Sequence, residues 1–173
     1  FDLFFNYGTH VADGCVPTLL ALVLLWKNWR AFLMVGVSVA LSAIVAQLLK
    51  HGVFPDMDRP SMFLERMHGV SLVEGVEMHH HNSFPSGHST AAYSMCLALA
   101  VLIAQRGPAL VLALLAAGLG LSRIYLSQHF TEDVVAGATI GTLTAYLVYH
   151  WLYVSSFASR KWLDRSPFRR QNQ

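Results

Sequence analysis

The chain has 173 residues, of which 54% are hydrophobic and only 13% are charged, and its mean hydropathy is +0.45. Ordinary soluble domains carry roughly 25% charged residues, so this composition excludes a typical soluble protein and favours a membrane protein. The net charge of +2, without a basic patch interleaved with aromatic residues, excludes a nucleic-acid-binding protein.

Five apolar stretches are candidates for membrane-spanning helices. A bilayer core of about 30 Å is crossed by roughly 20 helical residues. In chain order the stretches cover residues 9–26, 31–49, 89–105, 108–122 and 134–154. No linker-like segment divides the chain, which predicts a single domain over residues 1–173. We therefore expect an all-α, polytopic transmembrane helix bundle with five spans.

Two glycines in the last stretch, Gly137 and Gly141, are spaced so that another helix can pack closely against them. Packing within the bundle and a dimer contact would both explain this pair.

The long connection over residues 50–88 is predicted to be a loop on one face of the membrane. Within it, residues 60–78 mix apolar and charged side chains in a manner typical of an interfacial amphipathic segment. Such a segment would line the route of a lipid head group or cover the end of the bundle.

The basic residues predict the orientation, because Lys and Arg collect on the cytoplasmic side of membrane proteins. Eight of the twelve fall on one side of the predicted spans: Lys27, Arg30, Arg106, Arg160, Lys161, Arg165, Arg169 and Arg170. We expect a plasma (inner) membrane protein with a cytoplasmic C-terminal tail and a working face on the outer or periplasmic side. This orientation puts the first residues outside, which predicts a sixth helix upstream of residue 1.

Three groups of polar residues lie on the predicted outer face. The first is Lys50 with Arg59-Pro60, two cations able to hold phosphate oxygens. Taken alone, a snorkelling lysine and a loop arginine explain this group equally well. The second is Phe84-Pro85-Ser86-Gly87-His88-Ser89-Thr90, which leads into the third span. A helix that begins there directs free amides and its positive dipole end at one point, which suits an anion.

The third group is Ser122-Arg123, His129 and Asp133, between the fourth and fifth spans. On a helical turn, the spacing of four residues places His129 and Asp133 on one face. The carboxylate can then accept a hydrogen bond from one imidazole nitrogen and leave the other as a nucleophile. A histidine and an aspartate at this spacing are more often structural, but here Arg123 and His88 share the face.

Together these groups resemble the three signature motifs of the type 2 phosphatidic acid phosphatase superfamily, the membrane lipid phosphatases related to vanadium haloperoxidases. The second and third motifs match fully. In the first, the family usually has six residues between Lys and Arg-Pro, whereas this chain has eight, residues 51–58.

The resemblance implies hydrolysis of a phosphate monoester or diphosphate on a membrane lipid. Candidate substrates are phosphatidic acid, phosphatidylglycerophosphate, an isoprenyl diphosphate or a phosphorylated lipid A. It further implies that His129 attacks phosphorus and becomes phosphorylated, that Asp133 orients it, and that His88 protonates the departing oxygen. The phosphate-binding residues would be Lys50, Arg59, Ser86, Gly87 and Arg123.

The resemblance implies no metal and no other cofactor, and no carboxylate cluster accompanies the motifs to hold a hard cation. The run His79-His80-His81 suggests a metal site, but a hydrated loop beside a phosphate site accounts for it. Cys15 and Cys96 lie in or beside apolar stretches and predict neither a disulfide nor a metal site.

Two other functions remain open. A vanadate-dependent haloperoxidase would use the same residues, although those relatives are soluble. A non-catalytic protein that binds or transports anionic lipids would need the cations, but would not need an acid and a nucleophile.

Overall fold

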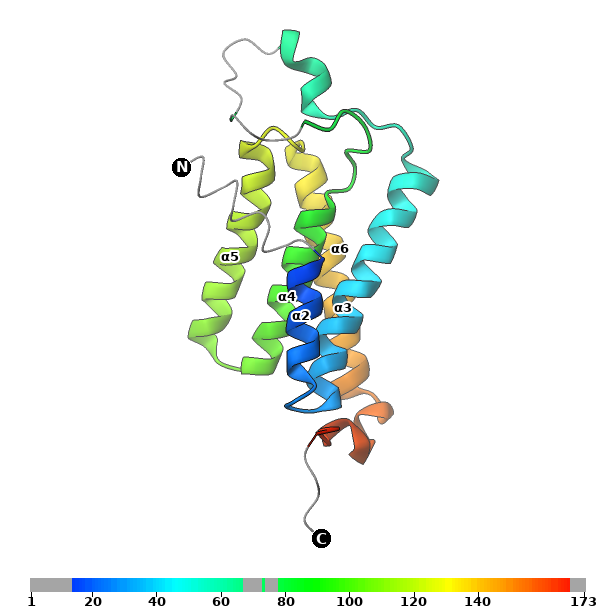
Figure 1. Cartoon of the computed structure of the whole chain (residues 1–173), viewed down its shortest axis with the longest axis vertical. Helices are drawn as coiled ribbons and strands as arrows, with labels where there is room; N and C mark the ends of the chain where they lie inside the picture. Colours follow the sequence, from blue (N-terminus) through cyan, green and yellow to red (C-terminus); the bar gives the residue numbers. More distant parts are fainter. Residues whose placement is uncertain (1–13, 67–72, 74–77, 169–173) are drawn as a thin grey trace.

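The computed structural model describes residues 14–66, 73 and 78–168, and these residues form helices and connecting segments without a strand. The α-helices among these residues are α2 (Cys15–Leu24), α3 (Trp29–Leu48), α4 (Gly87–Ile103), α5 (Arg106–Tyr125) and α6 (Thr131–Tyr149). They run roughly along one direction (Figure 1). The predicted all-α bundle is confirmed, and α3 to α6 match the last four predicted spans to within a few residues.

In the part of the chain that the structure describes, two helical stretches are long and apolar enough to cross a membrane, Trp29–Val53 and Arg106–Tyr125. The first combines α3 with the π-helical turn η2 (Leu49–Val53), and α6 continues likewise into η4 (His150–Val154). Within the described residues, α2 and α4 are apolar but shorter. The predicted first span, residues 9–26, lies partly outside the described residues, as does most of the predicted amphipathic segment 60–78.

Glycines allow α6 to pack closely on α4. A Cβ atom on Gly141 would overlap the backbone carbonyl oxygen of Thr90, and one on Gly137 would lie 2.5 Å from the carbonyl oxygen of Ser86. Real Cβ atoms do not approach backbone that closely, so a larger residue would push the helices apart. The predicted glycine pair is therefore used inside the bundle, beside the start of α4.

The end of the bundle opposite the three motifs is rich in aromatic residues. All four tryptophans of the sequence, Trp26, Trp29, Trp151 and Trp162, lie at helix ends or short connections there. The Arg30 side chain joins this end to the tail, because it forms a bidentate ion pair with Asp164 at 2.7 and 2.8 Å. Tryptophan gathers where membrane proteins cross the lipid–water interface.

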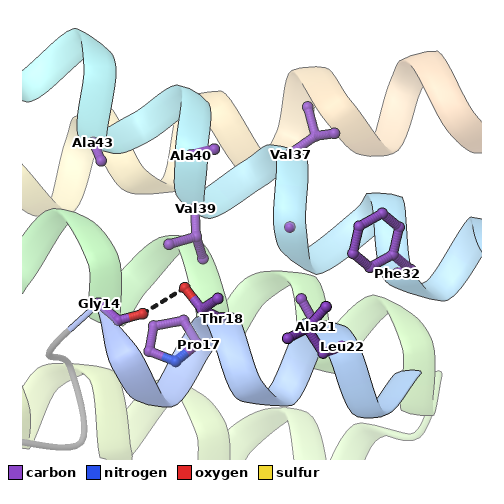
Figure 2. A pocket seen from close by; sticks show the side chains of 11 residues that line it. Gly14, Pro17, Thr18, Ala21, Leu22, Phe32, Val37, Val39, Ala40 and Ala43 are labelled. Atoms are coloured by element: carbon purple, nitrogen blue, oxygen red, sulfur yellow. Dashed lines mark hydrogen bonds between the residues drawn. The ribbon is translucent and has the colours of Figure 1, made fainter. Parts of the chain in front are cut away.

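An apolar groove of about 470 Å³ lies between α2 and α3. Figure 2 shows its lining, which includes Pro17, Ala21 and Phe32 and carries no ionisable side chain. The groove has no charged side chain to bind a phosphate, and the hydroxyl of Thr18 in its lining donates to the carbonyl of Gly14. The chemistry must be sought at the ends of the helices.

Candidate active site

The fold brings all three motifs to one end of the bundle. Helices α3 and α5 run towards this end, whereas α4 and α6 start from it (Figure 1). The motif residues consequently sit at helix ends: Lys50 in the π-turn after α3, Arg59 before the 3₁₀ helix η3 (Pro60–Arg66), Ser86 to His88 at the start of α4, Arg123 in the last turn of α5, and His129 and Asp133 around the start of α6.

His129 and Asp133 form the predicted pair. The Nδ1 atom of His129 lies 3.2 Å from Oδ2 of Asp133, and both side chains are almost fully buried. With Asp133 ionised, Nδ1 carries the proton and donates a hydrogen bond to the carboxylate, so the lone pair of Nε2 stays available. The pair therefore has the geometry that a histidine nucleophile requires.

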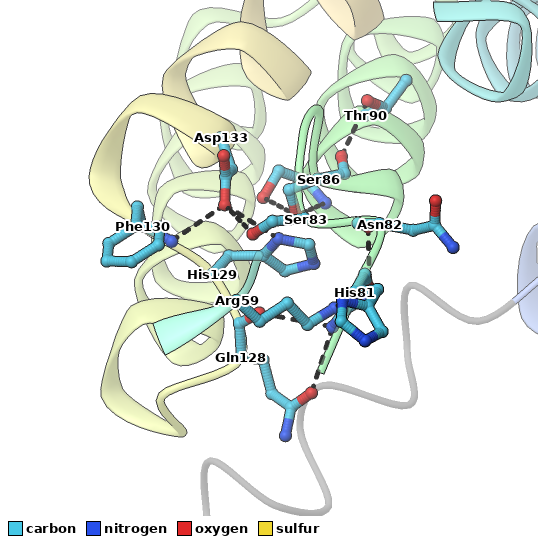
Figure 3. A network of polar contacts seen from close by, with 11 residues as sticks. Arg59, His81, Asn82, Ser83, Ser86, Thr90, Gln128, His129, Phe130 and Asp133 are labelled. Carbon is cyan, nitrogen blue, oxygen red and sulfur yellow. Dashed lines mark hydrogen bonds and ion pairs between the residues drawn. The ribbon is translucent and has the colours of Figure 1, made fainter. Parts of the chain in front are cut away.

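Two further donors hold the Asp133 carboxylate in place. Its Oδ2 atom accepts hydrogen bonds from the hydroxyl of Ser83 and, at 2.9 Å, from the backbone N–H of Phe130. Figure 3 shows these contacts and the imidazole of His129 meeting at the carboxylate. Ser83 is itself positioned by its backbone N–H, which donates to the carbonyl of Met57 at 2.9 Å. The orientation of His129 thus depends on a serine that the sequence motifs did not single out.

Arg59 is a buried cation with neutral hydrogen-bond partners. Only 9% of its surface is exposed, yet its four hydrogen bonds go to the carbonyl oxygens of His81, Asn82 and Gln128 and to the side-chain Oε1 of Gln128. Among the described residues no carboxylate forms a hydrogen bond with it, although Asp133 acts on it electrostatically. Burying a cation in this way is costly unless it serves a ligand. An anion bound beside it would balance its charge.

Gln128 connects this arginine to the rest of the site. Its backbone N–H donates to the carbonyl of Arg123 at 2.9 Å, and its side chain accepts from Arg59. The side chain is nearly inaccessible. Gln128 therefore places the guanidinium of the first motif against the loop that carries His129, and it too was missed from the sequence.

The start of α4 offers an anion-binding helix terminus. Ser86 is the N-cap residue, and its hydroxyl oxygen accepts from the backbone N–H and the hydroxyl of Ser89. The backbone N–H of Ser86 donates to the carbonyl of Asp133, which ties this terminus to the His129 pair. Among the described residues, no atom lies within 4 Å of a Cβ built on Gly87. The start of α4 therefore borders open space at Gly87, and the first amides of a helix, which the helix itself does not use, suit an anion there.

The remaining two cations, Arg123 and Lys50, lie close enough to the His129–Asp133 pair to interact with it electrostatically. Arg123 is 7% exposed, and its positive charge, like that of Arg59, disfavours protonation of His129 and lowers its pKa. Lys50 interacts electrostatically with Arg59, Arg123 and Asp133. The eight-residue spacing therefore does not separate Lys50 from Arg59, because the π-turn and the turn after it fold the segment back on itself. The structure brings all eight predicted site residues to this end.

The surroundings of His129 keep its imidazole neutral. Burial, together with the positive charges of Arg59 and Arg123, lowers the pKa of His129 from 6.5 to about 4, and the hydrogen bond to Asp133 only partly offsets this. A protonated imidazole has no free lone pair, so a low pKa favours nucleophilic attack at physiological pH.

The three consecutive histidines support the neighbouring loop. The carbonyl of His79 accepts from the hydroxyl of Ser61, which also contacts Nδ1 of His80, and Nδ1 of His81 lies 3.0 Å from Oδ1 of Asp58. Within the described part of the chain, no group of three or more His, Cys, Asp or Glu side chains could hold a metal ion. These contacts connect the segment before the second motif to the start of η3.

The family model of the PAP2 superfamily matches residues 31–156, which include every residue of the site. The chain belongs to the PAP2 superfamily.

Two relatives are similar over part of this chain. Phosphatidylglycerophosphatase B of Bacillus subtilis is 35% identical over 75 residues, which cover 38% of this chain and 37% of that protein. Lipid A 1-phosphatase of Rhizobium johnstonii is 31% identical over 107 residues, or 60% of this chain and 41% of that protein. The matches thus span less than half the length of these relatives.

Two solved structures share the fold. LpxE of Aquifex aeolicus superposes with a TM-score of 0.72 at 26% identity, covering 85% of this chain and 84% of that one. A transmembrane PAP2-type phosphatidylglycerolphosphate phosphatase from Bacillus subtilis gives a TM-score of 0.70 at 22% identity, covering 90% and 79%. The fold is thus that of a transmembrane PAP2 phosphatase.

Proposed function

We propose that this protein hydrolyses the phosphate group of a membrane lipid through a phosphohistidine intermediate. One observation carries the proposal: a buried histidine is oriented by a carboxylate at 3.2 Å, beside two buried arginines and a helix N-terminus. Cations and amides are enough to bind an anion. The oriented neutral histidine is what turns a binding site into a catalytic one.

In the first step, Nε2 of His129 attacks phosphorus and the bond between phosphorus and the lipid oxygen breaks. His88, the second residue of α4, donates a proton to the departing oxygen, so that the lipid leaves as an alcohol or, from a diphosphate, as a monophosphate. Asp133 stabilises the positive imidazole that forms, in the same way as the carboxylate of a catalytic triad.

In the second step, water attacks the phosphohistidine and gives its proton to the now neutral His88. Inorganic phosphate leaves, and His129 returns to its neutral form. In both steps, Lys50, Arg59 and Arg123, with the Ser86 hydroxyl and the Gly87 amide, hold the equatorial oxygens of phosphorus. Such preorganised positive charge usually supplies the largest part of the rate enhancement, so we expect turnover without a metal ion.

The relatives support a lipid phosphate as the substrate. One is a phosphatidylglycerophosphatase and another a lipid A 1-phosphatase, so their names favour phosphatidylglycerophosphate and phosphorylated lipid A among the four candidates. The distribution of basic residues supports the predicted orientation, because six of the seven described basic residues outside the site, all but Arg66, lie at the tryptophan-rich end. The site would then face the outer or periplasmic side.

Phosphate release tests the proposal directly. The purified protein in detergent is supplied with each candidate lipid in the presence of excess EDTA, beside a His129→Ala variant that elutes as the same monodisperse species. Release by the native protein alone is the expected result. If folded protein binds the lipids but releases no phosphate, the function is binding or transport of anionic lipids, and the proposal fails.

A further inference from the structure

The segment between Lys50 and Arg59 carries an exposed apolar surface beside the cations. Val53, Phe54 and Met57 are 60%, 38% and 40% exposed. We call these three side chains the apolar rim. Large apolar side chains left exposed close in sequence to the cations of a site are candidates for a binding surface.

The rim is attached to the catalytic network by two contacts. The ring of Phe54 meets the ring of Phe84 edge to face, with centroids 4.8 Å apart, and Phe84 directly precedes the Pro85-Ser86-Gly87 turn. The carbonyl of Met57 accepts from the backbone N–H of Ser83, whose hydroxyl holds Asp133. Phe54 is thus linked through Phe84 to the turn that carries Ser86, and Met57 is linked through Ser83 to Asp133.

Local backbone geometry sets the direction of the rim. The π-turn Leu49–Val53 widens the end of α3, and the N–H of Phe54 closes it by donating to the carbonyl of Leu49 at 2.8 Å. Asp56 then adopts a left-handed conformation with a φ of 59°, which reverses the chain towards Arg59. All residues of this turn from 51 to 58 are exposed, and the three side chains of the rim are its large apolar ones. Isolated π-turns occur frequently at functional sites.

The depth of this turn in the bilayer follows from the length of the helix. The continuous stretch Trp29–Val53 has 25 residues, or about 37 Å at a rise of about 1.5 Å per residue, against a hydrocarbon core of about 30 Å. With Trp29 at one lipid–water interface, the last turn would extend into the head-group layer on the other side. A phospholipid whose phosphate lies at the cations would place its backbone and the first methylenes of its chains at this level.

We propose that the apolar rim of Val53, Phe54 and Met57 binds the proximal part of the substrate's hydrocarbon chain, and so makes the site selective for long-chain lipid phosphates over short-chain or soluble ones. This inference rests on the proposed phosphatase function and adds the residues that read the apolar part of the substrate. The cations would recognise the phosphate, and the rim would recognise the chain beside it.

The test compares two substrates that share a head group, dioleoyl and dihexanoyl phosphatidic acid. The variant Val53→Thr with Met57→Gln keeps the shape of both side chains and removes their apolar character, while leaving the ring contact of Phe54 in place. The matched control is Leu114→Gln, which changes a 65% exposed leucine on α5. We expect the ratio of kcat/KM for the long-chain over the short-chain substrate to fall about tenfold in the double variant and to stay at the native value in the control.

An unchanged ratio in the double variant would overturn the proposal. So would an equal loss on both substrates, because it would assign these side chains to support of the loop alone. A fall in the long-chain to short-chain kcat/KM ratio in Leu114→Gln as large as that in the double variant would overturn it too. Such a result would show that any lipid-facing position has this effect. If the native protein cleaves neither substrate nor any other lipid phosphate, it is the proposed function that fails. If the native protein turns over lipid phosphates but the ratio is unchanged in the double variant, only the proposed role of the apolar rim is rejected.

Discussion

Lowering the pH should destabilise this protein through His129 in particular. The folded protein holds this imidazole neutral with a pKa of about 4, whereas the unfolded chain protonates it near 6.5. The unfolded state thus binds more protons between these values. The contribution of His129 to stability is complete above pH 6.5 and is lost as the pH falls towards 4.

The size of the effect follows from the shift, at about 1.4 kcal/mol per pKa unit. At pH 5 the loss in the free energy of unfolding is about 2 kcal/mol, because pH 5 lies 1.5 units below the unfolded pKa of 6.5 and still above the folded pKa of about 4. For a chain of this length, that corresponds to a melting temperature about 4–8 °C lower. The histidine is nearly inaccessible to solvent, so screening by water does not reduce the figure much.

The assay is thermal unfolding in detergent at pH 8 and pH 5, for the native protein and for His129→Gln. Glutamine does not titrate, and its amide can still donate to Asp133. The other histidines and carboxylates titrate in both proteins, so the difference between the two temperature shifts isolates His129. We expect the native protein to lose about 4–8 °C more than the variant. Equal losses would show that the imidazole is not held neutral, and would refute the reasoning.

Three substitutions test individual contacts. Asp133→Asn should lower kcat by about 10⁴, the scale known for a triad carboxylate, while the exposed neighbour Glu132→Gln keeps native kinetics. Ser83→Ala should lower kcat about tenfold to a hundredfold with KM nearly unchanged, because a charge-assisted hydrogen bond is lost; a rise in KM alone would contradict its positioning role. Gly141→Ala should lower the melting temperature by several degrees because its Cβ meets backbone. Gly118→Ala, with nothing within 4 Å, should leave it unchanged or raise it.

Sequence patterns predicted the helices well because a bilayer imposes a simple rule on length and polarity. The spacing of His129 and Asp133 predicted their contact, although His129 lies in the connection before α6 and only Asp133 lies within the helix. The positions of the three motifs at helix ends were enough to predict that they meet, because successive helices of a bundle alternate in direction.

The supporting residues could not be predicted in this way. Ser83 reaches Asp133 across 50 positions of sequence, and serine before a turn is too common to signal such a contact. Gln128 faces Arg59 across 69 positions, for which no local pattern exists. The connection 50–88 was expected to be a loop with an amphipathic segment over residues 60–78, and η3 lies at the start of that segment, but the π-helical turn η2 was not predicted. A π-turn depends on bonds between residues five apart and has no compositional signature.

The most direct test of the central claim is to trap the phosphorylated enzyme. Protein mixed with a lipid substrate carrying labelled phosphate is quenched within one turnover under alkaline conditions, digested, and analysed for the labelled residue by mass spectrometry. The proposed mechanism predicts an acid-labile phosphate on His129 that is absent from His129→Ala. Turnover by the native protein with no label, or with the label on another residue, would contradict the histidine nucleophile.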